Sequence, residues 1–467
     1  MDAMVERSGP LSGTLTVPGD KSISHRAVMC AALAQGTTRI EGFLAAEDCR
    51  RTIRAFQAWG VPMTEEPGAP ACPAGAAGRQ AVAVEGRGTR GLAPAAAPID
   101  AGNSGTTMRL LAGMAAGQSF ATELTGDASL QARPMRRIVE PLERMGARIA
   151  GRELPGRPAE IFPPLLIHGQ PLRPLTYTLP VASAQVKSAI LLAALYAPGA
   201  TVITEPQASR DHTERMLRLF GVEVRARDNT VTLHADGSPL RSPGRLVVPG
   251  DLSSAAFWLV ACSIIPTSAL TLEGVGLNPT RTGVLDILRY MGAAVSMKRT
   301  QDAWEPRGTL LVKAAELRAT VIKETLIPRT IDELPILMVA ATQAKGITEL
   351  HGIEELRVKE TDRVHSMVEG LSRMGAKIGV RRASELPAGA PLRGTPSKDA
   401  IVIEGPSALH GAVVDSFGDH RTAMSLVIAG LVARGTTQVR GVGMIPTSYP
   451  GFFDDLRRLG AAVTLEQ

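Results

Sequence analysis

The chain contains few aromatic residues and few cysteines, and each scarcity narrows the classes of protein it can belong to. Aromatic residues make up 3% of the 467 residues, which argues against the base-stacking surfaces of single-stranded nucleic-acid binders. The four cysteines, at positions 30, 49, 72 and 262, form no CxxC pair. We therefore expect reduced thiols in a cytoplasmic protein and no disulfide framework.

Long apolar runs are also missing. The longest strongly apolar run, residues 255–265, falls far short of the roughly 20 residues that span a bilayer. The first seven residues contain no apolar signal region. We therefore expect neither a membrane span nor export.

Several catalytic motifs are absent as well. The sequence has no GxxxxGK[ST] loop, no GxGxxG opening a strand–helix unit, no HExxH, no Cys/His cluster and no GxSxG elbow. These absences leave acid–base chemistry without a metal or cofactor. The net charge of +6 comes without a Lys/Arg-rich run, so the cations suit small anionic substrates at least as well as nucleic acid.

The most informative feature present is an internal repeat. An aromatic residue, Met or Leu followed by Gly and a small residue occurs six times, after an amphipathic stretch and before a β-branched run. This pattern predicts a helix that ends at a left-handed glycine and leads into a strand. The glycines are Gly60, Gly146, Gly221, Gly292, Gly375 and Gly460.

A second sixfold pattern lies upstream of each glycine. Six Ala-rich helices, apolar on most faces and therefore buried, are predicted to begin near residues 25, 107, 186, 253, 334 and 421 and to end near 36, 117, 199, 266, 346 and 435. Each unit then reads as buried helix, strand, surface helix, strand, strand. Six such copies indicate one duplicated supersecondary unit.

The length of the chain favours two domains, and six units divide into three plus three. Residues 17–22 (VPGDKS) are echoed by residues 248–253 (VPGDLS), which we interpret as two crossings between domains. One domain then comprises residues 21–250, and the other comprises 1–20 with 251–467. The Pro- and Gly-rich segments 67–78 and 94–98 are predicted surface loops.

Polar motifs precede five of the six buried helices. Ser22 and Ser24 are candidate N-caps of the first. Helix N-termini and added cations favour anions, so convergence of these ends would make an anion-binding cleft between the domains. The motifs are residues 20–26, 102–109, 182–187, 331–334 and 418–421; the sixth, 250–254, lacks cations.

Three connections add further charge, including Arg133 and Arg210. The third, residues 357–363, is a mixed-charge run that could equally be a solvated helix start, and Asp332 could merely cap its helix. As chemistry, Asp332 and Glu360 supply carboxylates for acid–base catalysis, with Lys21 as a possible partner.

Taken together, these motifs resemble the 5-enolpyruvylshikimate-3-phosphate synthases, a family of enolpyruvyl transferases. The resemblance covers nearly the whole chain. It implies a two-domain inside-out α/β barrel of six βαβαββ repeats, three per domain, with buried parallel helices. It rests on residues 19–26, 102–109, 133–134, 183–185, 209–212, 332–333, 357–363 and 419–421.

The resemblance also implies a reaction. The enolpyruvyl group of phosphoenolpyruvate would pass to the 5-hydroxyl of 3-phosphoshikimate with release of phosphate, in the shikimate pathway of aromatic amino acid biosynthesis. By the family pattern, Asp332 takes the hydroxyl proton and Glu360 protonates the methylene carbon, giving a tetrahedral intermediate. Lys21 is the third catalytic candidate, and no metal or cofactor is implied.

Two sets of binding residues follow from the same resemblance. The set for 3-phosphoshikimate is Lys21, Ser22, Arg26, Ser183, Gln185, Arg210, Asp332 and Lys359. The set for phosphoenolpyruvate is Lys21, Gly105, Arg133, Gln185, Arg363 and Arg421.

Some residues depart from the best-known branch and are typical of a second, more divergent class. Thr447 stands where a phosphate-binding lysine is common, and Arg210 is a candidate to compensate. The inhibitor glyphosate occupies the phosphoenolpyruvate site beside the position of Gly105, so this glycine predicts inhibition. The other departures are Ser104, Thr107, Leu110, Ala184 and Glu355.

Two alternatives remain beside this interpretation. The UDP-N-acetylglucosamine enolpyruvyl transferases share the fold but resemble a pattern with a reactive Cys before Arg133, and residues 126–132 contain none. A basic nucleic-acid-binding protein would rest on net charge alone. We expect a monomer that binds neither nucleic acid nor membrane.

Overall fold

The computed structural model describes residues 1–66, 79–301, 304–382 and 399–466. The predicted loop at 67–78, which contains Cys72, lies outside the described residues. The described chain forms two compact units. Unit 1 contains Met1–Pro18 and the described residues from Pro249 onward, and unit 2 contains those between Gly19 and Val248.

Unit 2 consists of three repeats in chain order. The first contains α1 (Lys21–Leu33), β3 (Ala34–Leu44), α2 (Glu47–Ala58), β4 (Met63–Glu66) and β5 (Arg79–Arg87). The second contains β6 (Ile99–Asp100), α3 (Gly105–Ala115), β7 (Ala121–Thr125), α4 (Ala128–Gln131), α5 (Arg136–Arg144), β8 (Arg148–Leu154) and β9 (Arg157–His168). The third contains β10 (Thr176–Thr178), α6 (Ala184–Ala194), β11 (Gly199–Thr204), α7 (His212–Leu219), β12 (Glu223–Arg227) and β13 (Thr230–Ala235).

Unit 1 holds the other three repeats. The fourth contains β2 (Ser12–Leu15), α8 (Leu252–Ile264), β16 (Ala269–Gly276), α9 (Gly283–Tyr290), β17 (Ala294–Gln301) and β18 (Arg307–Lys313). The fifth contains β19 (Val321–Ile322), η1 (Glu324–Arg329), α10 (Leu334–Thr342), β20 (Gly346–His351), η2 (Glu354–Leu356), α11 (Arg363–Arg373), β21 (Lys377–Arg381) and β22 (Ala400–Gly405). The sixth contains β23 (Val413–Asp415), α12 (His420–Gly430), β24 (Thr437–Arg440), η4 (Val442–Thr447), α13 (Phe452–Arg458), β25 (Val463–Glu466) and β1 (Asp2–Val5).

The six sheets share one topology, which confirms the predicted βαβαββ repeat. In each sheet the strand that follows the buried helix pairs in parallel with one neighbour and antiparallel with the last strand of the repeat, which in turn pairs antiparallel with the strand before it. Where the parallel strand directly precedes the helix in the chain, the helix provides the crossover that parallel pairing requires. The strand orders are β6-β7-β9-β8, β10-β11-β13-β12, β17-β18-β16-β2, β19-β20-β22-β21, β23-β24-β1-β25 and, with β14 formed by Leu240–Arg241, β14-β3-β5-β4.

Three repeats take a strand from a distant part of the chain. In the fourth repeat, β2 pairs in parallel with β16. β14 (Leu240–Arg241) and β15 (Arg245–Val247) supply the parallel partner of β3 in the first repeat. The N-terminal strand β1 lies between β24 and β25 and completes the sixth repeat. Each unit is therefore closed by strands that local sequence does not supply.

The six repeated glycines all adopt the left-handed conformation that the sequence predicts. Their φ angles lie between 81° and 110°, a region that costs other residues free energy because of their Cβ atoms. Each glycine thus ends its surface helix and turns the chain into the next strand.

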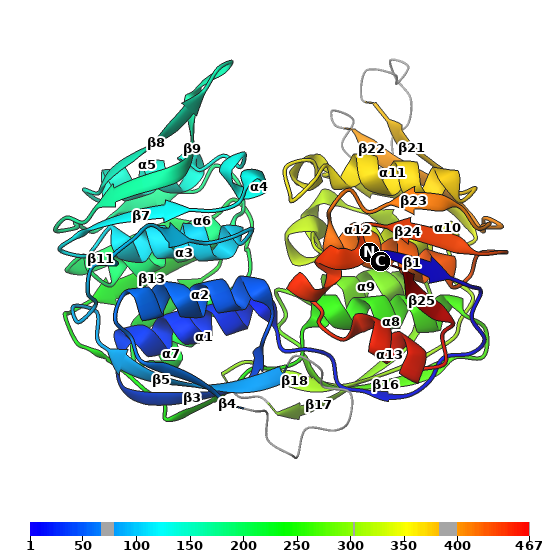
Figure 1. Cartoon of the computed structure of the whole chain (residues 1–467), viewed down its shortest axis with the longest axis horizontal. Coiled ribbons are helices and arrows are strands. Elements are labelled where there is room, and N and C mark those ends of the chain that lie inside the picture. Colours follow the sequence, from blue (N-terminus) through cyan, green and yellow to red (C-terminus); the bar gives the residue numbers. More distant parts are fainter. Residues whose placement is uncertain (67–78, 302–303, 383–398, 467) are drawn as a thin grey trace. The chain divides into compact units, whose positions relative to one another are not determined.

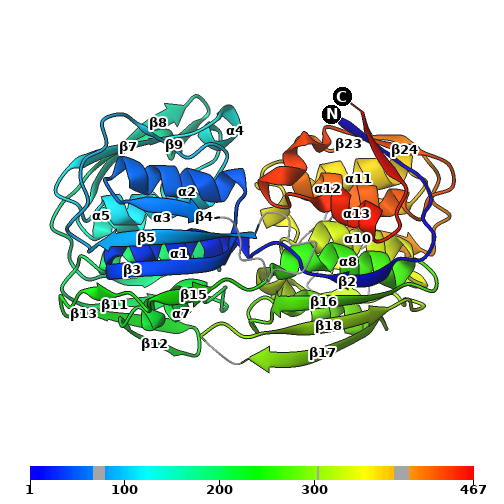
Figure 2. The same ribbon diagram turned by 60° about the horizontal axis from the view of Figure 1, so that its bottom comes forward.

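The Ala-rich helices form the interior of each unit, as predicted. Nearly every residue of α8, α10 and α12 is buried, and these helices contact one another. Figures 1 and 2 show them inside unit 1 with the sheets on the outside. Small Ala and Gly side chains permit this close approach; in unit 2, Gly113 of α3 abuts the backbone of Ala189 in α6.

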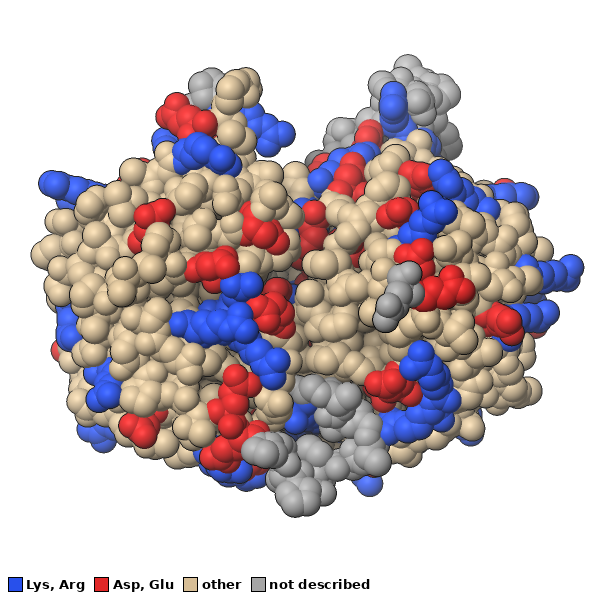
Figure 3. All heavy atoms as spheres, viewed as in Figure 1, with Lys and Arg blue, Asp and Glu red and all other residues tan. Residues whose placement is uncertain are grey.

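Charged side chains of both signs are interspersed on the face shown in Figure 3. That face therefore shows no broad field of positive charge among the residues drawn in colour. Within the described ranges, no helix is long and apolar enough to cross a membrane.

Candidate functional site

The buried helices of unit 2 begin at side-chain caps. The Asp20 carboxylate accepts a hydrogen bond from the Ile23 amide at 2.9 Å and caps α1. Ser104 caps α3, and Ser183 caps α6. These short polar residues satisfy amide groups that have no partner within the helix.

The prediction that Ser22 or Ser24 caps the first helix is wrong. α1 begins four residues earlier than expected, at Lys21, so both serines lie inside it. The Ser24 hydroxyl instead accepts from the Leu44 amide at 3.0 Å, and Ser22 is partly exposed on the first turn.

Lys21 lies at the start of α1 and forms an ion pair with Asp48 of α2. The Asp48 carbonyl accepts from the Thr107 hydroxyl of α3 at 3.4 Å. A buried chain of hydroxyls continues this link, because Thr52 contacts both His25, at 2.7 Å, and Thr107, at 2.8 Å. The first turns of α1 and α3 are therefore fixed relative to each other.

Arg26 is buried among neutral acceptors. Its guanidinium donates to the Thr213 hydroxyl at 2.7 Å, the Ser188 hydroxyl at 2.9 Å and the Ser22 carbonyl at 2.9 Å. Only 5% of the residue is exposed, and within the described chain no carboxylate forms an ion pair with it. Burial lowers the pKa of Arg26 to about 10, against the opposing charges of Glu214 and Asp20 and with a smaller contribution from Arg210. A cation in this setting favours an anionic ligand.

A second group surrounds Gly105 at the start of α3. Arg109 donates to the Gln185 side chain at 2.7 Å, and Gln185 donates to Thr106 at 3.0 Å. Arg133 donates to the Asn103 side chain at 2.6 Å. A Cβ atom on Gly105 would lie 2.7 Å from the guanidinium of Arg109 and 3.4 Å from that of Arg133. The glycine thus leaves space beside two cations.

The same unit contains a buried ionic triad that was not predicted from the sequence. Lys187 of α6 pairs with Glu205 at 2.7 Å and with Glu214 of α7 at 2.8 Å. Although burial opposes its charge, the two carboxylates raise the pKa of Lys187. Because Glu214 follows Thr213, the triad joins the elements that surround Arg26. The sequence placed Lys187 in the polar motif 182–187 but did not indicate its two carboxylate partners.

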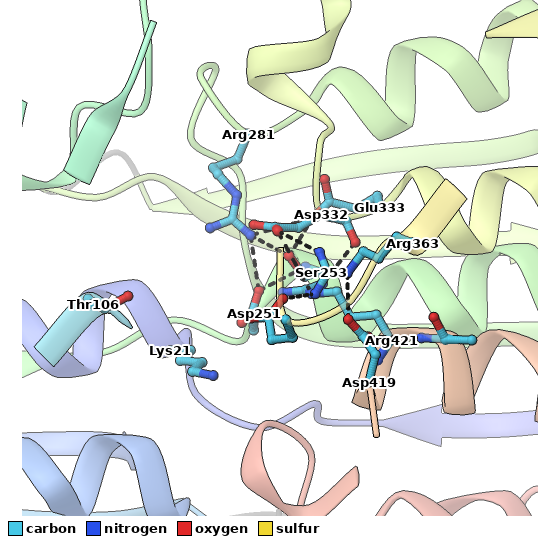
Figure 4. A network of polar contacts seen from close by, with 12 residues as sticks. Lys21, Thr106, Asp251, Ser253, Arg281, Asp332, Glu333, Arg363, Asp419 and Arg421 are labelled. Atoms are coloured by element: carbon cyan, nitrogen blue, oxygen red, sulfur yellow. Dashed lines mark hydrogen bonds and ion pairs between the residues drawn. The ribbon is translucent and has the colours of Figure 1, made fainter. Parts of the chain in front are cut away.

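Unit 1 contains a cluster around Arg363, which we call the Arg363 cluster (Asp332, Glu360, Arg363, Asp419 and Arg421). Figure 4 shows Asp332, Arg363, Asp419 and Arg421 of this cluster. The Arg363 guanidinium donates to Asp419 at 2.8 Å and to Glu360 at 2.5 Å, and it lies 3.5 Å from Asp332. Although burial opposes its charge, these carboxylates raise the pKa of Arg363 further above its ordinary value. One cation thus holds both carboxylates that the sequence singled out.

The alternative of a solvated helix start does not hold for Arg363. The residue is the first of α11 and is fully buried. The true cap of this helix is Asp362, which accepts from the amides of Val364, at 3.0 Å, and His365, at 3.1 Å. Only part of the run behaves as a surface helix start.

The alternative that Asp332 caps its helix is also wrong. α10 begins at Leu334, and its N-cap position is occupied by Glu333 and not by Asp332. Instead Arg421 of α12 donates to the Asp332 carbonyl at 3.0 Å and lies 3.9 Å from its carboxylate. Asp332 is therefore held between two arginines.

Asp419 holds the first turn of α12 in place. Its carboxylate accepts from the Arg421 amide at 2.8 Å while its other oxygen accepts from Arg363. Burial would raise the pKa of Asp419, but the adjacent Arg363 outweighs it and the pKa is lowered. Asp419 thus stays charged and orients both arginines.

A second cluster in unit 1, the Arg281 cluster (Asp251, Ser253, Arg281 and Glu333), was not foreseen. Residues 250–254 contain no cation of their own. Arg281 reaches them from the β16–α9 connection, whose sequence belongs to none of the predicted motifs. Because Arg281 and Asp251 are 30 residues apart in the sequence, no local pattern predicted their contact.

The remaining predicted residues are partly exposed. Lys359 precedes α11, Arg210 precedes α7, and both lie at intermediate burial. Thr447 ends the short helix η4, where its hydroxyl donates to the Met444 carbonyl at 2.6 Å.

Comparison with known proteins first defines the fold. The enolpyruvyl transferase NikO from Streptomyces tendae is similar with a TM-score of 0.74, over 99% of this chain and 98% of NikO, at 18% identity. An EPSP synthase structure from Acinetobacter baumannii is similar with a TM-score of 0.82 and 40% identity over 100% of both chains. The architecture is therefore that of the two-domain inside-out barrels.

The sequence comparisons then give the family. The pattern described as "EPSP synthase (3-phosphoshikimate 1-carboxyvinyltransferase)" matches residues 5–456. The 3-phosphoshikimate 1-carboxyvinyltransferase of Geobacillus kaustophilus is 48% identical over 96% of this chain and 98% of that protein. The enzyme of that name from Thermosynechococcus vestitus is 48% identical over 96% of each chain. The chain belongs to the EPSP synthase family.

Proposed function

We propose that the chain transfers the enolpyruvyl group of phosphoenolpyruvate to the 5-hydroxyl of 3-phosphoshikimate and releases phosphate. Membership of the EPSP synthase family supports this reaction. The sequence suggested two enolpyruvyl-transfer reactions, and the comparisons favour this one over transfer to UDP-N-acetylglucosamine.

One observation carries the assignment of the chemistry: Arg363 contacts both Asp332 and Glu360. General acid–base catalysis needs two groups with opposite tasks held at fixed positions. A shared, permanently charged guanidinium fixes two carboxylates without itself exchanging a proton.

In the proposed reaction, Asp332 removes the proton of the attacking hydroxyl as its oxygen bonds to the central carbon of phosphoenolpyruvate. Glu360 supplies a proton to the methylene carbon, which becomes a methyl group. The tetrahedral intermediate then returns a methyl proton and breaks its carbon–oxygen bond to phosphate. The arginines stabilise the negative charge of the reacting groups electrostatically.

The cations of unit 2 suit the anionic groups of the substrates. We assign Arg26 and the neighbouring Arg210 to 3-phosphoshikimate, because Arg26 is buried beside neutral acceptors and gains a counter-charge when an anion binds. Ser22, Ser183, Gln185 and Lys359 complete that assignment.

Phosphoenolpyruvate is assigned to the residues around Gly105 in unit 2 and to the two arginines of the Arg363 cluster. Arg133 and Gln185 flank Gly105 through Asn103 and Arg109. Lys21 is assigned to both substrates.

The direct test is release of phosphate from phosphoenolpyruvate plus 3-phosphoshikimate without added metal. We expect turnover that requires both substrates. We also expect Asp332→Asn and Glu360→Gln each to lower kcat by about 10²- to 10⁴-fold. Absence of turnover with the unmodified chain would refute the proposed function.

We further propose that glyphosate competes with phosphoenolpyruvate beside Gly105, and that the chain works as a cytoplasmic monomer. The described cysteines are free and buried, which is consistent with a reducing compartment. Sedimentation measurements would give the oligomeric state.

A further inference from the structure

The Arg281 cluster joins three separate segments of unit 1 (Figure 4). Asp251 and Ser253 lie at the start of α8, Arg281 lies between β16 and α9, and Glu333 immediately precedes α10. All four residues are at most 5% exposed. The enzyme therefore keeps one cation and two carboxylates in its interior at this point.

The contacts within the cluster centre on one guanidinium nitrogen. Arg281 Nη2 donates to the Ser253 hydroxyl at 2.6 Å and to Asp251 Oδ1 at 3.2 Å, and it lies 3.6 Å from Glu333 Oε1. The Ser253 hydroxyl donates to the same Glu333 oxygen. Glu333 is thus held by a cation and a hydroxyl from two other segments.

Glu333 is covalently joined to Asp332, the proposed base. On the other side, Arg421 donates to the Asp332 carbonyl at 3.0 Å. The backbone of Asp332 is therefore fixed from both directions: by the Arg421 contact and by the anchored side chain of the next residue. The turn is closed locally by the Glu333 amide, which donates to the Thr330 carbonyl at 2.9 Å.

A role in stability alone explains this cluster poorly. Burying charged groups costs free energy that an apolar cluster of the same volume avoids, so buried ion clusters often add little net stability. Their contacts do, however, fix side chains in one geometry. The place where this rigidity matters is the adjoining residue Asp332.

We propose that Glu333 and Arg281 are positioning residues that hold Asp332 in its reactive orientation. This inference rests on the proposed role of Asp332 as the base. Neither residue belongs to the predicted substrate-binding sets. Their effect should therefore appear in the rate of the chemical step more than in substrate affinity.

The test uses steady-state phosphate release by the full chain, with Glu333→Gln, Arg281→Met and Arg281→Lys. For Glu333→Gln and Arg281→Met we expect kcat to fall by about 10- to 100-fold, as for a small misplacement of a catalytic group. KM for both substrates should stay within about twofold of the value for the unmodified chain, because neither residue is proposed to contact a substrate in the ground state. Arg281→Lys should recover part of the loss, since it keeps the charge.

A matched control is Asp455→Asn, which alters another buried carboxylate of unit 1 outside both clusters. Its kcat should match that of the unmodified chain. If Glu333→Gln and Arg281→Met keep full kcat and lose only thermal stability, the positioning role is refuted. If either fails to fold, Ser253→Ala, which removes the bridging hydroxyl alone, decides in its place.

Asp332→Asn separates the two claims. If it abolishes turnover while Glu333→Gln remains fully active, the positioning role fails and the proposed base stands. If Asp332→Asn retains full activity, the assignment of the base fails, and with it the positioning role. Loss of kcat in both, at unchanged KM, supports the inference.

Discussion

At the scale of single residues, the important property of Gly105 is that it has no side chain, because a Cβ atom there would lie close to Arg109 and Arg133. Its backbone lies outside the left-handed region, so alanine is conformationally acceptable there. A methyl group would nevertheless approach Arg109 to 2.7 Å and Arg133 to 3.4 Å. The neighbouring guanidinium of Arg109 must then move, which narrows the space beside the two cations.

The first prediction concerns this position. Gly105→Ala should weaken inhibition by glyphosate by at least about tenfold, while turnover falls less, because the chain between the carboxylate and the phosphorus is one atom longer in the inhibitor and is more sensitive to lost space. Inhibition constants measured against phosphoenolpyruvate for both forms test this. Equal inhibition of the two forms would contradict it.

Asp455 leads to a prediction on pH dependence. This carboxylate on α13 accepts from the Tyr449 hydroxyl at 2.9 Å, and that hydroxyl also accepts from Trp258. Burial raises the pKa of Asp455 to about 6, against the opposing effects of the Tyr449 hydrogen bond and of Arg458. Because the folded protein holds this proton more tightly than the unfolded chain, rising pH destabilises the fold between about pH 4 and 6.

Asp455→Asn should therefore stabilise the protein above pH 6, by roughly 1–2 kcal/mol, and have little effect at pH 4. Denaturant unfolding of both forms at the two pH values measures this difference. A stability difference that does not change with pH would refute the assignment.

Residue-scale features were only partly predictable. The sequence marked Arg363 because charges lie close along the chain, but left it open whether the run faces solvent. It misplaced the cap of the first helix, because Asp20 and Ser22 are both good cap residues and only the exact first turn distinguishes them. Arg281 gave no signal, because its partners are distant in sequence.

At the scale of elements, the Lys187 triad holds α6 and α7 together behind Arg26. Lys187→Met would leave Glu205 and Glu214 buried beside each other without their cation. We expect a loss of about 3–5 kcal/mol in the free energy of unfolding, measured by denaturant titration.

The matched control is Lys345→Met, which breaks an ion pair with Glu316 at 2.6 Å on the surface. Because this pair is largely exposed to solvent, its loss should lower the free energy of unfolding far less than the loss of Lys187 does. Similar losses in the two variants would show that the buried triad contributes nothing special.

Helices and strands were well predicted because their signals are local. Apolar residues on all faces marked the buried helices, and the repeated glycines marked the ends of the surface helices. The strands β14, β15 and β1 were harder to place, because each completes a repeat that is remote in sequence. The register of these strand pairs is set when the whole unit folds and brings the distant segments together. The pattern of residues within each strand does not determine it.

At the scale of the whole molecule, six copies of one topology explain how a long chain closes two units. β1 pairs with β24 and with β25, and Asp2 lies opposite Glu466. The first strand of the chain is thus a central strand of the last repeat. Both ends of the described chain meet in one sheet.

This closure predicts tolerance to circular permutation. Joining residue 467 to residue 1 through a short flexible linker, with new ends between Glu6 and Gly9, keeps β1 in its sheet and should preserve kcat within about threefold. Deleting residues 1–6 removes the strand and should lower the melting temperature sharply. Phosphate release and thermal unfolding measure both; full stability of the truncated chain would contradict the pairing.

The fold class and family could be predicted at this scale because six repeats reinforce one another. The chemistry depends on smaller features: which carboxylates share Arg363, and how Asp332 is held. These arise from contacts between segments about 30 to 90 residues apart, as in the pairing of Arg363 with Asp332 and of Arg421 with the Asp332 carbonyl.

The most direct test of the central claim is to run the reaction in D₂O. Mass spectrometry of the product then measures how much solvent deuterium has been incorporated at its methylene carbon. If Glu360 delivers a proton to that carbon, the unmodified chain will label the product and Glu360→Gln will not label product or phosphoenolpyruvate over the same time. Labelling by Glu360→Gln at the unmodified rate would show that another group moves this proton and would contradict the account.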